Sequence, residues 1–143
     1  ITHLRDVTPG IIEQHRSAFD PLVFWRCLYV TEENIRVEKA CLALKQNDLR
    51  TLGRLLYESH EGLSKQYEVS CAELDFLVDT VRAFPEVYGG RLMGGGFGGC
   101  TINLVSAEAV QEVSSFVEKK YENRFSRKLA TYIVSLSDGT SIE

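Results

Sequence analysis

Seven of the eleven glycines in this chain lie between Gly89 and Gly99, in the run GGRLMGGGFGG. Each glycine held in an ordered backbone costs about 0.5–1 kcal/mol relative to alanine. A domain with a net stability of about 5–15 kcal/mol does not carry several such costs for a simple connection. Glycine-rich turns expose successive N–H groups that no side chain covers, and such turns bind phosphate oxygens. The run therefore predicts a loop that another group, with phosphate as the first candidate, approaches closely.

Two known phosphate-binding motifs do not fit this run. The segment Gly94–Gly99 matches G-x-G-x-x-G by letter, but that motif requires a following helix, whereas Cys100–Val105 alternates like a strand. No Gly-Lys-Ser or Gly-Lys-Thr follows the glycines, which excludes a P-loop. A hairpin with a broad glycine loop remains. The alternative explanation is a hairpin that only lets another backbone pack closely.

The spacing of apolar residues predicts the helices that must position this hairpin. The first has Val37, Ala40, Cys41 and Leu44 on one face, and the third is opened by a Ser-Cys-Ala-Glu capping box and ended by Pro85. The predicted helices cover about Glu33–Lys45, Asp48–Leu63, Ser70–Pro85 and Ser106–Tyr121. The Glu32-Glu33 pair is expected at a helix start, where carboxylates favour the helix dipole.

Three segments have the pattern of strands, and a turn is expected at Asp138-Gly139. The predicted strands are Val87–Met93, Cys100–Val105 and Ala130–Leu136. Helices in the first half followed by strands around a further helix predict an α+β fold. We expect a ferredoxin-like antiparallel sheet with helices packed on one face.

Length and composition indicate one globular domain of 143 residues, 44% hydrophobic and 25% charged. The 16 basic and 20 acidic residues are mixed along the chain, without the basic stripe of a nucleic-acid-binding protein. No apolar run approaches the roughly 20 residues that span a bilayer, so no membrane partner is expected. The four cysteines are too widely spaced for a C-x-x-C motif and are expected to be reduced thiols of a cytoplasmic protein.

The chain begins with Ile1 and not with methionine, which indicates a part of a longer protein. Residues 1–24 are expected to form an extended or partly helical lead-in segment.

Three segments together closely resemble the carboxy-terminal half of the galactokinases, which belong to the GHMP small-molecule kinases. They are ESHEGLSKQYEVSCAELD from Glu58, VYGGR from Val87 and GGGFGGCT from Gly94. The resemblance extends over most of the chain, from about Val30 to Gly139. The combination is highly specific, although the glycine run alone would indicate only the superfamily.

This resemblance implies that residues 1–143 form the carboxy-terminal domain of a two-domain kinase. The implied reaction is the ATP-dependent phosphorylation of galactose at its anomeric hydroxyl, which gives galactose 1-phosphate. The amino-terminal domain of such enzymes supplies the sugar site, the catalytic residues and the main phosphate loop. No catalytic or metal-ligating residue is therefore expected in this chain, and the chain alone is expected to be inactive.

The amino-terminal domain of the same kinase is the implied partner, and it would hold most of the ATP, Mg²⁺ and galactose contacts. The resemblance assigns this chain the glycine-rich third motif, near the phosphates. By position, that motif consists of Arg91, Gly94, Gly95, Gly96, Phe97, Gly98 and Gly99. Leu92-Met93 stands where the family has Met-Thr, so no contact of that threonine hydroxyl is carried over.

Two side chains near the motif receive structural interpretations. Phe97 is expected to hold the loop against the sheet, and His60 is expected to be a hydrogen-bonded structural histidine without a catalytic role. Two other functions stay open. One is a GHMP kinase with a different small substrate, and the other is a non-catalytic ferredoxin-like domain that keeps the hairpin for packing.

Overall fold

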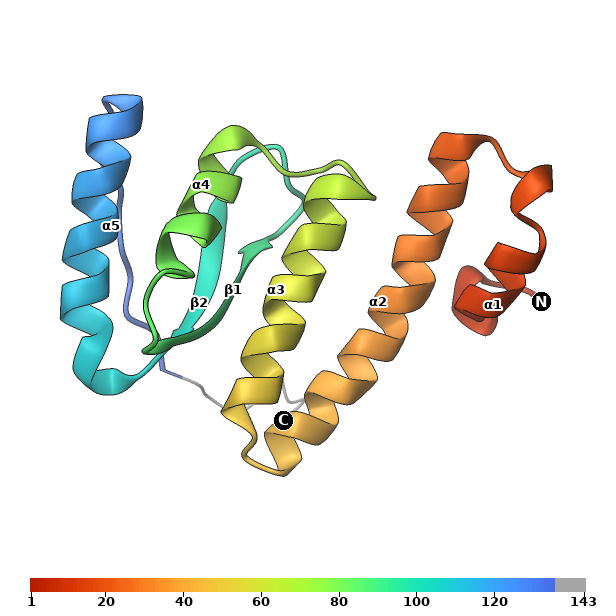
Figure 1. Cartoon of the computed structure of the whole chain (residues 1–143), viewed down its shortest axis with the longest axis horizontal. Helices are drawn as coiled ribbons and strands as arrows, with labels where there is room; N and C mark the ends of the chain where they lie inside the picture. The colour runs from red at the N-terminus through yellow and green to blue at the C-terminus, as the bar shows by residue number, and fades with distance from the viewer. Residues whose placement is uncertain (136–143) are drawn as a thin grey trace, which may run out of the picture.

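The computed structural model describes residues 1–135. Figure 1 shows the helices side by side, with the hairpin behind α4 and beside α3. Three-residue 3-10 turns lie at Leu4–Asp6, Arg16–Ala18 and Ala107–Ala109. The helices are α1 (Pro9–Gln14), α2 (Pro21–Lys45), α3 (Leu49–Lys65), α4 (Ala72–Val81) and α5 (Val110–Phe125), and the strands are β1 (Val87–Met93) and β2 (Cys100–Val105).

Helix α2 begins twelve residues before the predicted start at Glu33. Asp20 caps it, because its carboxylate accepts hydrogen bonds from the amides of Leu22 and Val23, and Pro21 occupies the first turn. The predicted inner face was wrong, since Val37 is 54% exposed. The buried residues of α2 are Phe24, Leu28, Tyr29, Thr31 and Ala43.

Helix α3 begins as predicted, with Asp48 as its cap. The Asp48 carboxylate accepts a hydrogen bond from the Thr51 amide at 3.0 Å. Hydrogen bonds from the Thr51 side chain and from the Thr51 amide hold the pKa of Asp48 below its usual range, because they favour the ionised form. The preceding Asn47 has a left-handed backbone, with φ +54°, which ends α2 and reverses the chain.

The capping box predicted for α4 was wrong. The cap of α4 is Cys71, one residue later than expected, and it makes no side-chain hydrogen bond to the helix. The Ser70 hydroxyl donates instead to a carboxylate oxygen of Asp75 at 2.5 Å. The Ser70 hydroxyl therefore donates to a side chain of the helix, whereas in a capping box its oxygen would accept a hydrogen bond from a backbone amide.

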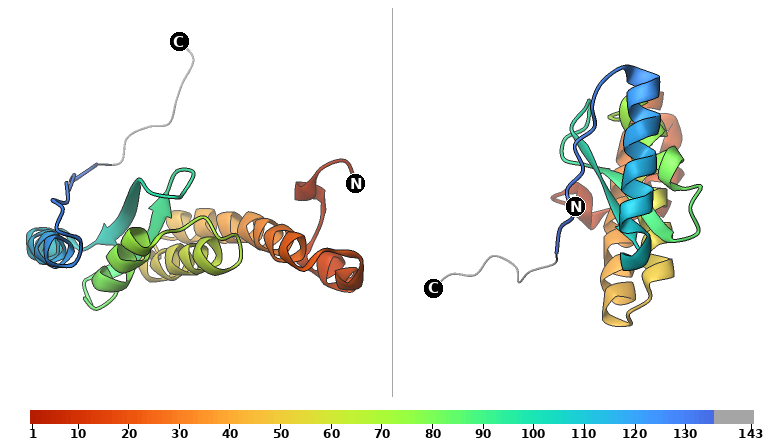
Figure 2. Two further views of the ribbon diagram at one scale, coloured as in Figure 1. Left: turned by 90° about the horizontal axis from the view of Figure 1, so that it is seen from above. Right: turned by 90° about the vertical axis from the view of Figure 1, so that its left-hand side faces the viewer.

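Strands β1 and β2 have the bounds that the sequence predicted and pair as an antiparallel hairpin closed by Met93 and Cys100. Figure 2 shows α3 and α4 on the same side of this hairpin. Helix α3 touches β1 backbone to backbone. A Cβ atom added at Gly53 would lie 1.9 Å from the carbonyl oxygen of Tyr88, and one at Gly89 would lie 2.1 Å from the carbonyl oxygen of Gly53.

Three groups of buried side chains hold the elements together. The first group joins α4, β1 and α5, and the second joins α2, α3, α4 and β1. The third packs α1 against α2. Their central members are Val81, Val87 and Val113; Tyr29, Leu63 and Leu92; and Ile12, Phe24 and Leu28. Within the described part of the chain, no helix combines the length and the apolar character needed to cross a membrane.

The α+β class is confirmed, with helices packed against an antiparallel sheet that has two strands within residues 1–135. The strand predicted at Ala130–Leu136 was wrong over residues 130–135, which pair with neither β1 nor β2. Tyr132 is 82% exposed there. A strand exists only through its backbone partner, and alternating residues do not supply one. Leu136 and the turn expected at Asp138-Gly139 lie outside the described residues.

A buried histidine joins α3, α4 and β1, as the structural interpretation of His60 predicted. The Leu92 amide donates to His60 Nδ1 at 3.2 Å, and His60 Nε2 lies 3.2 Å from an Asp75 carboxylate oxygen. Because Nδ1 accepts a hydrogen bond, the ring is neutral and carries its proton on Nε2. Burial lowers the pKa of His60 below 6.5, and the nearby carboxylates of Asp75 and Asp79 only partly oppose this effect.

Gly53→Ala tests the contact between α3 and β1. The added methyl group would collide with backbone atoms, so we expect a loss of about 1–3 kcal/mol in the free energy of unfolding, measured with urea. Gly10→Ala is the matched control, because the nearest atom to its Cβ would be 3.9 Å away. Equal unfolding midpoints for the two variants would contradict this close contact.

His60 also makes stability depend on pH. The unfolded chain protonates this histidine near pH 6.5, and the folded chain only below that value. The free energy of unfolding therefore falls as the pH drops from about 7 through the folded pKa. We expect His60→Gln to remove this part of the pH dependence in urea unfolding, and the exposed His15→Gln to keep it. An unchanged profile in His60→Gln would show that the ring is not held neutral.

Candidate functional site

The six residues Gly94–Gly99 form the loop that joins β1 to β2, hereafter the glycine loop. Gly94, Gly96, Gly98 and Gly99 have φ between +85° and +138°. Side chains are rarely tolerated there, which explains why these four of the loop's five glycines are needed. Phe97, at φ +59°, occupies the left-handed region despite its side chain.

The glycine loop rests on the connection between α3 and α4. The Phe97 amide donates a hydrogen bond to the Val69 carbonyl at 2.7 Å. A Cβ atom at Gly96 would lie 2.1 Å from the same oxygen, so this glycine allows the close approach. The expectation that Phe97 packs against the sheet was wrong, because its side chain is 77% exposed. The backbone of this residue, and not its ring, anchors the loop.

The remaining amides of the glycine loop are open. Within residues 1–135, the Phe97 amide is the only one of the loop that donates a hydrogen bond to the protein. A Cβ atom added at Gly94, Gly95 or Gly98 would meet nothing within 4 Å. The loop therefore presents bare backbone N–H groups without obstructing side chains. Such a surface suits an anion with several oxygen atoms.

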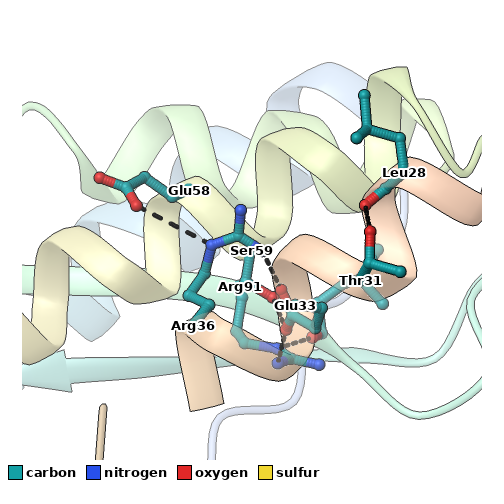
Figure 3. A network of polar contacts seen from close by, with 8 residues as sticks. Leu28, Thr31, Glu33, Arg36, Glu58, Ser59 and Arg91 are labelled. Atoms are coloured by element: carbon teal, nitrogen blue, oxygen red, sulfur yellow. Dashed lines mark hydrogen bonds and ion pairs between the residues drawn. The ribbon is translucent and has the colours of Figure 1, made fainter. Parts of the chain in front are cut away.

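Arg91, on the strand that leads into the glycine loop, is bound to its own chain. Its Nη1 lies 3.3 Å from Oε1 of Glu33 on α2, and its Nε donates to the Leu92 carbonyl at 2.9 Å. The Ser59 hydroxyl donates to the same Glu33 oxygen at 2.6 Å, as Figure 3 shows. The positive charge of Arg91 is therefore partly offset by Glu33, and the cluster joins β1 to α2 and α3.

A second arginine completes the ion-pair cluster. Arg36 pairs with Glu33 one turn earlier in α2 and with Glu58 of α3, 3.8 Å from its Nε. Burial raises the pKa of the neighbouring Tyr29 to about 12, and the Glu33 carboxylate adds to this effect. The Tyr29 phenol is therefore protonated at neutral pH and cannot act as a base.

The sequence did not predict two residues that contact the site, Glu33 and Val69. Glu33 was expected to stabilise a helix start, but it lies in the middle of α2, where it pairs with arginines. The early start of α2, signalled by Asp20-Pro21, would have revealed this. The role of Val69 cannot be predicted from its residue type, because it contributes a backbone carbonyl oxygen, which every residue has.

The described residues contain no group of three His, Cys, Asp or Glu side chains placed to hold a metal ion. The carboxylates nearest to Arg91 are already engaged by arginine side chains. Within residues 1–135 the side chains therefore do not fit a magnesium site, whereas the open amides of the glycine loop fit a phosphate group.

Comparisons with known proteins agree on one family. The family described as GHMP kinases C terminal matches residues 40–123, more than half of the chain. The galactokinase of Bos taurus is 38% identical over 139 residues, which cover 97% of this chain and 34% of that protein. The galactokinase of Thermotoga neapolitana is 43% identical over 114 residues, or 80% of this chain and 33% of that protein.

A solved structure supports the same assignment. The galactokinase of Lactococcus lactis, crystallised with galactose, superposes with a TM-score of 0.85 at 31% sequence identity, over 90% of this chain and 33% of that one. The chain spans about a third of the length of the curated relatives it matches. The matched region, the hairpin and its helices show that this chain belongs to the GHMP kinase family, as a C-terminal domain.

Proposed function

We propose that this chain is the C-terminal domain of a galactokinase, which transfers the terminal phosphoryl group of ATP to the anomeric hydroxyl of galactose. The open amides of the glycine loop are the observation that carries this proposal. The similarity to galactokinases, one of them crystallised with galactose, supports the choice of sugar. We further propose that the reaction takes place in the cytoplasm.

In this proposal the work is divided between two domains. An N-terminal domain outside this chain supplies the catalytic residues, the sugar site and most contacts to ATP and Mg²⁺. The relatives support such a partner, because about two-thirds of their length lies outside the match. The catalytic and metal-binding residues belong to that partner, and this chain closes the phosphate end of the site.

Phosphoryl transfer depends on positioning and on stabilisation of charge more than on covalent help from the protein. The backbone N–H groups of Gly94, Gly95, Gly96, Gly98 and Gly99 would donate to phosphate oxygens. The exposed Phe97 would lie at the rim of the same site. Arg91 would add positive charge nearby, reduced by its pairing with Glu33.

The glycine loop can be tested in the full-length kinase proposed here. Gly96→Val and Gly98→Val should lower turnover by about tenfold or more. Both changes also disturb this chain itself, since Gly96 touches Val69 and both glycines have positive φ. Gly95→Val tests the loop with less effect on folding, because a side chain at Gly95 would meet open space and the backbone there has no positive φ. We expect it to lower turnover by about tenfold or more without changing the unfolding midpoint.

Galactose-dependent ADP release in a coupled assay measures these changes, with Gly10→Ala as a control away from the loop. Unchanged turnover in all three valine variants would contradict the close approach of a phosphate.

Residues 1–143 alone should not phosphorylate galactose, because the proposed catalytic residues belong to the N-terminal domain. The coupled assay with ATP, Mg²⁺ and galactose should show no ADP release above the background without sugar. The full-length protein should show release with galactose and less with related sugars and amino sugars. Activity of the 143-residue chain would overturn the proposed division between domains.

A further inference from the structure

The buried histidine described above holds the base of the glycine loop. The Leu92 amide, which donates to His60 Nδ1, lies two residues before the first loop glycine, Gly94. Leu92 is 0% exposed and His60 is 4% exposed, so no water competes for this hydrogen bond. Since β1 ends at Met93, the hydrogen bond from Leu92 to His60 is a buried contact of this strand directly before the loop begins.

Asp75, the partner of His60, also binds the connection between α3 and α4, on which the glycine loop rests. The Asp75 carboxylate receives hydrogen bonds from the ring of His60, from the Ser70 hydroxyl at 2.5 Å and from the Ser64 hydroxyl at 3.1 Å. Ser70 directly follows Val69, whose carbonyl accepts the Phe97 amide. The Asp75 carboxylate thus fixes the connection on which the middle of the loop rests.

A single pair of side chains therefore ties the glycine loop at two places. One tie runs from His60 to Leu92 at its base, and the other runs from Asp75 through Ser70 to its middle. The other amides of the loop have no partner within residues 1–135, so these ties, together with the pairing of β1 and β2, hold those amides in place. Neither side chain belongs to the loop itself.

We propose that His60 and Asp75 are positioning residues, which hold the glycine loop where its amides meet the transferring phosphoryl group. This inference rests on the proposed function. Positioning matters because a displacement of about 1 Å can lower a reaction rate by about a hundredfold. The pair acts through the loop and touches no substrate.

Two substitutions of His60 separate its two hydrogen bonds. The side-chain oxygen of His60→Asn can replace Nδ1 as acceptor for Leu92, whereas His60→Gln replaces Nε2 and leaves the Leu92 amide unpaired. In the full-length kinase, we expect His60→Gln to lower kcat by about tenfold or more and to change KM for galactose by about twofold at most. His60→Asn should retain most of the turnover.

Asp75→Ala tests the second tie, with Asp79→Ala on the same helix as the matched control. Asp79 is exposed and makes none of the hydrogen bonds of this network. We expect about a tenfold loss of kcat in Asp75→Ala and no change in Asp79→Ala. Hydrogen exchange of the Phe97 amide, measured by NMR in the 143-residue chain, should become faster in Asp75→Ala alone.

Local exchange distinguishes positioning from a general loss of stability. A purely structural role would accelerate hydrogen exchange throughout the chain and lower the unfolding midpoint. The proposal instead requires faster exchange at the Leu92 amide in His60→Gln and at the Phe97 amide in Asp75→Ala. Exchange in the core of α4 and α5 should stay unchanged in both variants. Wild-type turnover in His60→Gln and Asp75→Ala, or uniformly faster hydrogen exchange along the chain, would overturn the proposal. Absence of galactose phosphorylation by the unmodified full-length protein would instead refute the proposed function, and the exchange data would still test the ties.

Discussion

Direct contact between the backbones of α3 and β1 is the constraint on which the rest of this domain depends. Gly53 and Gly89 leave no room for even a methyl group between the helix and the strand. Because no side chain separates them, the two backbones pack directly against each other, and any side chain added at either glycine would push the helix away from the strand. About two turns further along α3, His60 then faces Leu92 of β1. The start of the glycine loop is thereby set by a contact at the opposite end of the strand.

The charged side chains around the loop are paired within the domain. Arg91 is paired with Glu33, and the Asp75 carboxylate is surrounded by hydrogen-bond donors. Among the described residues, backbone amides are the groups at the loop that have no hydrogen-bond partner in the chain. Amides held by a rigid backbone need little reorganisation when charge develops on a phosphate, and they lose no side-chain rotamer freedom on binding. This property suits a domain that completes a phosphate site whose reactive groups lie elsewhere.

Much of the hairpin could be predicted from the sequence. The bounds of β1 and β2 follow from alternating residues around a glycine run, and both are local properties. Other expectations failed because a distant partner decided the outcome. Ser70 donates to a carboxylate and does not cap the helix amides, and Phe97 is anchored by its amide. Residues 130–135 have strand-like alternation but pair with neither β1 nor β2.

The sequence alone determined the class of fold, the position of the glycine loop and the family, because spacing, glycine content and motif letters are readable along one chain. Only the tertiary structure decided which groups hold that loop. The partners of Leu92 and Phe97 come from α3 and from the connection after it, and that of Arg91 comes from α2. Hydrogen bonds depend on distances in space, and packing of the helices against the hairpin is what brings these groups within reach.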